Sequence, residues 1–299
     1  METLKTVTYE VTGRVARLTL NRPRRGNAIT YDMPRELASC VERASLDPAV
    51  HVIALSGNGE GFCAGYDLEE FARHLPEGVP AGSALDPRVI QANHDPSRPW
   101  DPTLDYAMMI RNVRGFMSLF HGEKPVVCKV HGYCVAGGTD MALCSDLLVV
   151  EDRAKIGYPP ARVWGSPTTA LWTYRLGPEK AKRLLFTGDS LSGTEAAAWG
   201  LATEAASRAD LDGRFESLLE RIARVPVSQL VMMKLLVNQT LTSQGLGPLQ
   251  TLGTVFDGVA RHTPEGYAFQ RRMAEVGHRQ AVSERDEPFG DAGRSTSKG

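Results

Sequence analysis

Apolar and polar positions divide the chain into two unlike parts. Up to about residue 150, short apolar runs alternate with segments of helical spacing, and glycine-rich turns separate them. This alternation predicts an α/β fold with parallel strand pairing. From Pro178 onward nearly every segment has the spacing of a helix. A tail of this kind is better suited to packing on a core or on a neighbouring subunit than to folding alone.

The first part is predicted to hold four strand regions and three helices, and the tail six helices. One long stretch, residues 74–103, is rich in Pro, Gly, Asp and Ser and has no clear period, which predicts a functional loop. The strand regions are 6–21 (a hairpin around Gly13), 50–56, 125–130 and 147–150, and the helices are 31–45, 106–120, 138–145, 178–186, 194–199, 211–224, 228–243, 248–261 and 265–282.

Composition and charge narrow the class of protein. The net charge of −1 over 299 residues shows no basic footprint for nucleic acid or for a membrane surface. No apolar run approaches the length of a spanning helix, and the N-terminus lacks the pattern of a signal peptide. The five cysteines are odd in number and lack CxxC spacing, which favours reduced, buried thiols in the cytoplasm and gives no support to a metal site.

Two glycine-rich turns carry the chemistry. The apolar run 126–130 leads to Gly137-Gly138, which open a helical segment, and Asp140 follows within its first turn. Residues 57–68 form a second such turn after the strand predicted at 50–56, with Asp67 placed to cap a helix. Glycine allows sharp turns and close approach to a ligand, and a helix start offers unpaired N–H groups. Such turns can therefore form a site for developing negative charge.

These two turns resemble the signatures of one enzyme family. Phe62-Cys63-Ala64-Gly65-Tyr66-Asp67-Leu68 is similar to the first signature of the crotonase (enoyl-CoA hydratase/isomerase) superfamily, and residues 132–142 are similar to the second. The likeness extends to flanking segments along the chain, namely Asn21-Arg22-Pro23, Asn27-Ala28, Leu185-Phe186-Thr187-Gly188, Glu195-Ala196 and Gly200-Leu201.

The resemblance implies a spiral of strand-strand-helix repeats. Residues 1–200 would form this core with an acyl-CoA site, and the helical region 201–286 would mediate trimers, alone or paired into hexamers. Residues 287–299 have the composition of a disordered tail. Coenzyme A would enter as part of the substrate, with no further cofactor.

By the resemblance, the backbone N–H groups of Tyr66 and Gly137 form an oxyanion hole for the thioester carbonyl oxygen. Removing or adding a proton beside a thioester places negative charge on that oxygen, which two fixed donors stabilise. Alternatively, both clusters are only tight turns. The Tyr66 ring either points into the pocket, where its hydroxyl acts as an acid or donor, or packs on the neighbouring loop.

Asp140 stands where family hydratases carry the first of two catalytic glutamates. It is predicted to act as a general base or nucleophile, or else to stabilise the helix N-terminus. The second glutamate is missing, because Pro160 stands at its position and proline has no proton to exchange. This favours a one-carboxylate reaction: isomerisation, hydrolysis or decarboxylation. The alternatives are a hydratase in which a tyrosine, a histidine or water replaces the acid, and a catalytically weak acyl-CoA binding protein.

Further residues are candidates for substrate binding. Arg24 and Arg25 suit the phosphates of coenzyme A, or form a solvated turn. Arg162 is a candidate partner for a substrate carboxylate, and His94, His121 and His131 are candidate bases or structural residues. The remaining candidates lie in the two turns or flank the lost glutamate: Ala64, Asp67, Leu68, Gly138, Tyr158, Pro160 and Trp164.

Overall fold

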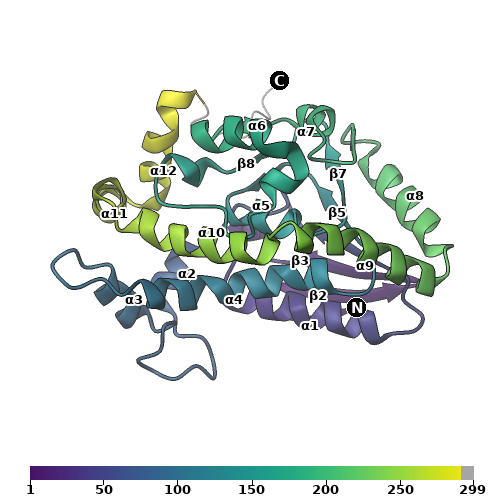
Figure 1. Ribbon diagram of the computed structural model, residues 1–299, viewed down its shortest axis with the longest axis horizontal. Coiled ribbons are helices and arrows are strands. Elements are labelled where there is room, and N and C mark those ends of the chain that lie inside the picture. Colours follow the sequence, from purple (N-terminus) through teal and green to yellow (C-terminus); the bar gives the residue numbers. More distant parts are fainter. Residues whose placement is uncertain (291–299) are drawn as a thin grey trace.

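The computed structural model describes residues 1–290, and its centre is a sheet of seven strands (Figure 1). The first three strands pair antiparallel and the other neighbours pair parallel, which confirms both the hairpin and the parallel pairing predicted from the sequence. In spatial order the strands are β1 (Glu2–Thr3), β2 (Val7–Thr12), β3 (Val15–Leu20), β4 (Val52–Gly57), β5 (Val126–Val130), β7 (Leu147–Glu151) and β10 (Glu204–Ala206).

A second sheet of three short strands lies beside the first. It consists of β6 (Tyr133–Val135), β8 (Lys155–Gly157) and β9 (Ser190–Leu191), with β6 and β8 parallel. The sequence analysis missed these strands because segments of two or three residues are too short to show a period. The small sheet matters for function, since β6 leads directly into the Gly137 turn.

Helices cover the sheet. The helices of the first part pack largely through buried apolar faces, and α1 spans Asp32–Leu46, within one residue of the prediction at each end. α4 begins earlier than predicted, because the Asp101 side chain caps it and Pro102 occupies its first turn. The bounds are α1 (Asp32–Leu46), α2 (Leu68–Arg73), α3 (Pro87–Asn93), α4 (Pro102–His121) and α5 (Gly137–Ala142).

The prediction of one long loop over residues 74–103 was wrong. This stretch contains α3, which Asp86 caps by accepting from the amide of Arg88. A helix of seven residues shows barely two turns of apolar spacing, and the flanking Pro and Gly residues hid it. The helix brings His94, at its C-terminal end, to the wall of the pocket described below.

The C-terminal part is helical, as predicted, and packs on the core. Leu211, Phe215 and Leu219 of α8 lie against the sheet residues Val52 and Val127. The helix predicted over 265–282 is two helices, since Gly277, at φ +83°, separates them. The helices are α6 (Trp172–Thr187, kinked at Gly177), α7 (Gly193–Trp199), α8 (Leu211–Ala223), α9 (Val227–Ser243), α10 (Leu246–Arg261), α11 (Pro264–Val276) and α12 (His278–Asp286).

The tail prediction for residues 287–299 was wrong at its start. Glu287–Phe289 forms a 3₁₀ helix, and the Arg162 guanidinium lies 4.0 Å from the centroid of the Phe289 ring. Residues 291–299 lie outside the described part of the chain. In the described residues no helix is long and apolar enough to cross a membrane.

Three segments far apart in the sequence gather at one end of the molecule. The α2–α3 region, the start of α4 and the helices α11 and α12 lie at the same end, with the C-terminal end of α10 between them (Figure 1). Glycine shapes the crossing of α10 over α4: a Cβ on Gly258 would lie only 2.9 Å from the Cβ of Asp105. The two helices can therefore approach closely at this point and bring their polar side chains together.

Candidate active site

The two glycine-rich turns predicted from the sequence lie side by side. The amide of Phe62 donates to the carbonyl of Tyr133 at 2.9 Å, and that of Val135 donates to the carbonyl of Cys63 at 3.1 Å. Gly65 has φ +97°, and a Cβ there would lie 2.9 Å from the Cβ of Ala136. A larger residue at position 65 would push the two turns apart, so glycine at this position allows them to approach closely.

The backbone amides of Tyr66 and Gly137 are both available to a ligand. Neither N–H donates a hydrogen bond to any residue within 1–290. Gly137 is the first residue of α5, where an N–H has no partner within the helix. The two turns lie close together here, since a Cβ on Gly65 would lie 3.7 Å from the amide nitrogen of Gly137.

The Tyr66 ring fills the space beside Gly137. A Cβ on Gly137 would lie 2.5 Å from Cε2 of the ring, which also packs edge-on against Phe71 at a centroid distance of 5.7 Å. The hydroxyl is buried and has no hydrogen-bond partner in the described part of the chain. Burial raises the pKa of this phenol well above its usual range, and the Asp140 carboxylate adds to the shift. The hydroxyl is therefore a neutral donor.

Tyr66 and Gly137 both line a single pocket of about 900 Å³. Its inner wall is largely apolar and includes Phe71, Ile90, Met108 and Met109. Helices α11 and α12 add Phe269, Met273 and Val282 from the other side. Of the residues predicted from the sequence, the pocket is lined by Ala64, Tyr66, Leu68, Gly137, Tyr158, Pro160 and Trp164.

Asp67 does not face this pocket. Its buried carboxylate lies 3.0 Å from Arg22 and 2.9 Å from Arg25, and it accepts from the amide of Glu70 at the start of α2. The oxygens of Asp67 are thus bound within the protein, and its role in substrate binding stays a prediction, whereas the predicted helix cap is confirmed. Arg25 also binds Glu69, which leaves Arg24 as the exposed cation of this turn.

Gly138 is likewise absent from the pocket wall, and its contact with substrate stays a prediction. It is buried, and a Cβ there would lie 2.7 Å from the carbonyl oxygen of Cys63. The residue lets α5 pack against the neighbouring turn and does not line the pocket.

Asp140 is fully buried behind the pocket wall. Its Oδ1 accepts from the amide and the hydroxyl of Thr169 at 3.2 and 2.9 Å, and the Thr168 hydroxyl lies 3.4 Å from Oδ2. Burial raises the pKa of Asp140 to about 7. The carboxylate does not border the pocket. Its catalytic role stays a prediction.

Asp140→Asn is expected to change how stability depends on pH. The folded state holds the Asp140 proton more tightly than the unfolded chain, so stability falls as pH rises from about 4 through 7. Relative to the wild type, the variant should gain about 2–3 kcal/mol in unfolding free energy between pH 5 and pH 8. Urea unfolding at both pH values measures this. An equal pH slope in both proteins would show that Asp140 is not strongly shifted.

Asp257, a buried acid on the pocket wall, was not among the candidate site residues predicted from the sequence. It lies on α10, and its Oδ1 accepts from the amide of Ser166 at 3.3 Å. A Cβ on Gly165 would lie 3.7 Å from that oxygen and 2.8 Å from the Cβ of Pro160. The carboxylate therefore lies close to Pro160. The available signal was the pair Asp257 and Arg261, four residues apart on one helix.

Arg261 links Asp257 to a second buried acid. Its guanidinium lies 2.9 Å from Asp257 and 3.0 Å from Asp105 of α4. Asp105 also accepts from the Trp100 indole at 2.8 Å and from the Asn93 amide at 2.9 Å. Three helices, α3, α4 and α10, and the segment before α4 are thereby joined through one carboxylate.

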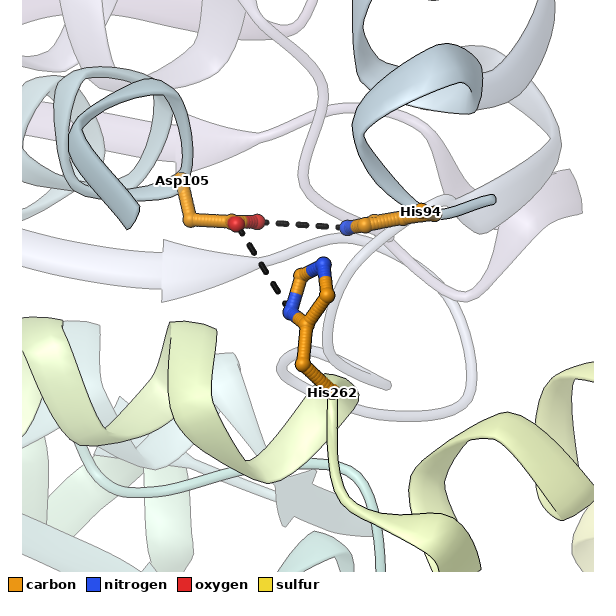
Figure 2. Close-up of side chains that lie close together, drawn as sticks. All are labelled: His94, Asp105 and His262. Atoms are coloured by element: carbon orange, nitrogen blue, oxygen red, sulfur yellow. Dashed lines mark hydrogen bonds and ion pairs between the residues drawn. The ribbon is translucent and has the colours of Figure 1, made fainter. Parts of the chain in front are cut away.

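Two imidazoles approach Asp105 from different elements, as Figure 2 shows. His94 Nε2 lies 3.2 Å from Asp105 Oδ1, and His262 Nδ1 lies 3.7 Å from Oδ2. The spacing of these groups would suit a metal ion. However, both ring nitrogens of His262 also lie within hydrogen-bond distance of backbone carbonyls, those of Gly258 and Asn93, at 2.9 and 3.1 Å. The cluster is a hydrogen-bond network, and His94 borders the pocket.

The other residues weighed from the sequence have partners elsewhere. His131 Nε2 lies 2.9 Å from the carbonyl of Gly59, and burial lowers the pKa of both His121 and His131. Neither histidine borders the pocket. Arg162 donates to Asp286 at 2.9 Å, which places its guanidinium against the C-terminal helix rather than against a substrate carboxylate.

Comparison with known proteins agrees with this geometry. The family model described as enoyl-CoA hydratase/isomerase matches residues 10–83 and 105–268. A Mycobacterium tuberculosis protein named as a candidate enoyl-CoA hydratase, EchA13, is 30% identical over 250 residues, which is 78% of this chain and 73% of that protein. Hydroxycinnamoyl-CoA hydratase-lyase of Pseudomonas fluorescens is 29% identical and matches 69% of this chain and 68% of its own.

Solved structures show the same fold. The crystal structure of an enoyl-CoA hydratase from Mycobacterium smegmatis is 57% identical, covers 99% of this chain and 98% of its own, and has a TM-score of 0.92. At 24% identity, an enoyl-CoA hydratase/isomerase from Xanthobacter autotrophicus covers 96% of this chain and 99% of its own with a TM-score of 0.81, which shows the fold alone. The predicted spiral architecture is thereby confirmed.

Proposed function

Because the chain belongs to the enoyl-CoA hydratase/isomerase family, we propose that it is an acyl-CoA enzyme that stabilises a thioester enolate through the amides of Tyr66 and Gly137. Charge develops on the thioester oxygen when a proton leaves the neighbouring carbon. A fixed donor at that oxygen contributes roughly 3 kcal/mol to the lowering of the barrier. Two such donors account for a substantial part of a catalysed proton transfer.

The observation that carries this proposal is the pair of unpaired amides on one pocket. Neither N–H has an acceptor within residues 1–290, and both residues line the same cavity. Buried N–H groups normally find partners, so two free donors at one apolar pocket indicate a ligand oxygen. The exposed Arg24 is the proposed contact for the phosphates of coenzyme A.

The reaction we propose uses a single carboxylate. Pro160 offers no proton at the position of the family's second glutamate, so the second acid that hydration by two carboxylates requires is absent at that position. Isomerisation, hydrolysis and decarboxylation each need the oxyanion donors and at most one acid or base. The names of several relatives favour the alternative, an ordinary hydratase. Prompt hydration of crotonyl-CoA would select that alternative.

A panel of acyl-CoA thioesters incubated in D₂O tests the proposal. Mass spectrometry of each thioester reports deuterium gained beside the carbonyl, which measures enolate formation, and also reports shifted, hydrolysed or decarboxylated products. At least one thioester is expected to exchange its protons far faster than without enzyme. Binding without exchange or turnover across the panel would favour a protein that only binds acyl-CoA.

Self-association completes the proposal. Helices α9 and α10 expose large apolar side chains, among them Leu236 (66%), Val237 (64%) and Phe256 (51%). An apolar surface of this kind is costly in water. We propose that it is covered in a trimer, alone or paired into a hexamer, as the family resemblance implies.

A further inference from the structure

We propose that Asp257 is the carboxylate that exchanges a proton with the acyl chain, in place of the acid that is missing at Pro160. This inference rests on the proposed enolate chemistry of the Tyr66 and Gly137 amides. It assigns the proton transfer to a residue of the C-terminal helical region rather than to either signature turn.

The position of Asp257 is the first support. Asp257 lines the same pocket as Tyr66 and Gly137, whose amides have no acceptor within residues 1–290. Gly165 brings it beside Pro160: a Cβ on Gly165 would lie 2.8 Å from the Pro160 Cβ and 3.7 Å from Asp257 Oδ1. The side chain thus reaches, from α10, the neighbourhood that the lost glutamate would occupy.

The second support is the set of partners of the carboxylate. Asp257 Oδ2 is buried and lies 2.9 Å from Nη1 of Arg261, an ion pair without hydrogen-bond geometry, and it has no hydrogen-bond partner within residues 1–290. The ion pair leaves the hydrogen-bonding capacity of this oxygen unfilled, so it can receive a proton from carbon at the wall of the pocket.

The surrounding charges suit a base. Burial raises the pKa of Asp257, and the Arg261 guanidinium opposes that shift. Around it lie Asp105 of α4, His94 of α3 and the Asp140 carboxylate of α5, whose pKa Asp257 helps to raise. A carboxylate with a raised pKa is a stronger base than one in water, which favours proton transfer from carbon.

Asp140, the acid predicted from the second signature turn, is less well placed than Asp257. Both of its carboxylate oxygens face Thr168 or Thr169, and the residue has no exposed surface. It does not border the pocket, whereas Asp257 does. Of the two buried acids, Asp257 is the one that a bound acyl chain can touch.

The step balances without a further reactant. Asp257 takes a proton from the carbon beside the thioester carbonyl and becomes a carboxylic acid. The electron pair of the broken C–H bond forms the carbon–carbon double bond of the enolate, and the negative charge moves to the thioester oxygen at the two amides. Return of the proton to the same carbon regenerates the substrate, and return to a conjugated carbon shifts a double bond.

Asp257→Asn in the full-length protein tests the inference. With the thioester of the panel that exchanges fastest, the variant is expected to lose at least about 100-fold in the rate of deuterium uptake. The wild-type rate should fall in acid as the base becomes protonated, and the variant should lack this transition. Asp86→Asn is the matched control, because this buried aspartate caps α3 away from the pocket and should leave the rate unchanged.

Two readouts separate the inference from the proposed function. The thioester carbonyl, labelled with ¹³C, should still shift downfield when it binds the Asp257→Asn variant, since both amides remain. Unchanged exchange in Asp257→Asn, or its loss in Asp140→Asn alone, would overturn the role of Asp257 and leave the oxyanion proposal standing. Absence of the carbonyl shift in the wild type would instead refute the oxyanion hole.

Discussion

Replacing Tyr66 by proline is expected to reduce kcat/KM at least about 100-fold, whereas replacing it by phenylalanine should cost far less. Proline removes the backbone N–H, and phenylalanine removes only the hydroxyl. The Tyr66 amide donates to no residue within 1–290, so proline deletes no internal hydrogen bond. The loss therefore reports on the ligand-facing role of this N–H.

Because proline also removes the ring, Tyr66→Ala is the matched control, since it removes the ring and keeps the amide. The ¹³C shift of the bound thioester carbonyl should shrink in Tyr66→Pro and persist in Tyr66→Phe and Tyr66→Ala. Circular dichroism and thermal melting check that all three variants are folded. Equal activity of a folded Tyr66→Pro and the wild type would remove the amide from the mechanism.

The second large effect concerns stability. Asp105→Ala is expected to lower the free energy of unfolding by about 3–5 kcal/mol, because it removes the shared acceptor of several buried donors and one of the two carboxylates that pair with Arg261. Arg261, Trp100, Asn93 and His94 all direct donors or ring nitrogens at this carboxylate. Its removal also weakens the junction of α3, α4 and α10. Urea unfolding of purified protein measures the change.

A surface ion pair supplies the control for this measurement. Lys129 and Asp212 pair on the surface, with the Asp212 side chain 79% exposed, and Asp212→Ala should change the unfolding free energy by less than about 1 kcal/mol. If Asp105→Ala cost as little as the surface variant, the buried network would not hold this wall of the pocket together.

The two turns that hold the proposed oxyanion donors could be predicted from the sequence because their signals are local. Gly65 and Gly137 each follow a strand and precede a helix, and apolar runs mark those strands within a few residues. The pairing of the two turns also followed from the family resemblance. The strands β6, β8 and β9 and the helix α3 could not be predicted, because segments of two to seven residues are too short to show a reliable period.

Asp257 could not be found in this way. Its nearest functional neighbour, Pro160, is almost one hundred residues away in the sequence, and only packing of α10 on the core brings them together. For Asp67 the sequence revealed the motif but not the partners of the side chain. Its place in a signature suggested contact with substrate, yet two arginines and a helix N-terminus bind its oxygens. Motifs show which residues matter but not which way they face.

The most direct test of the central claim is a crystal structure of the protein with a bound acyl-CoA thioester that turns over slowly. The amide nitrogens of Tyr66 and Gly137 are both expected to lie about 2.7–3.1 Å from the thioester oxygen. A thioester oxygen beyond hydrogen-bond distance of either nitrogen would contradict the account.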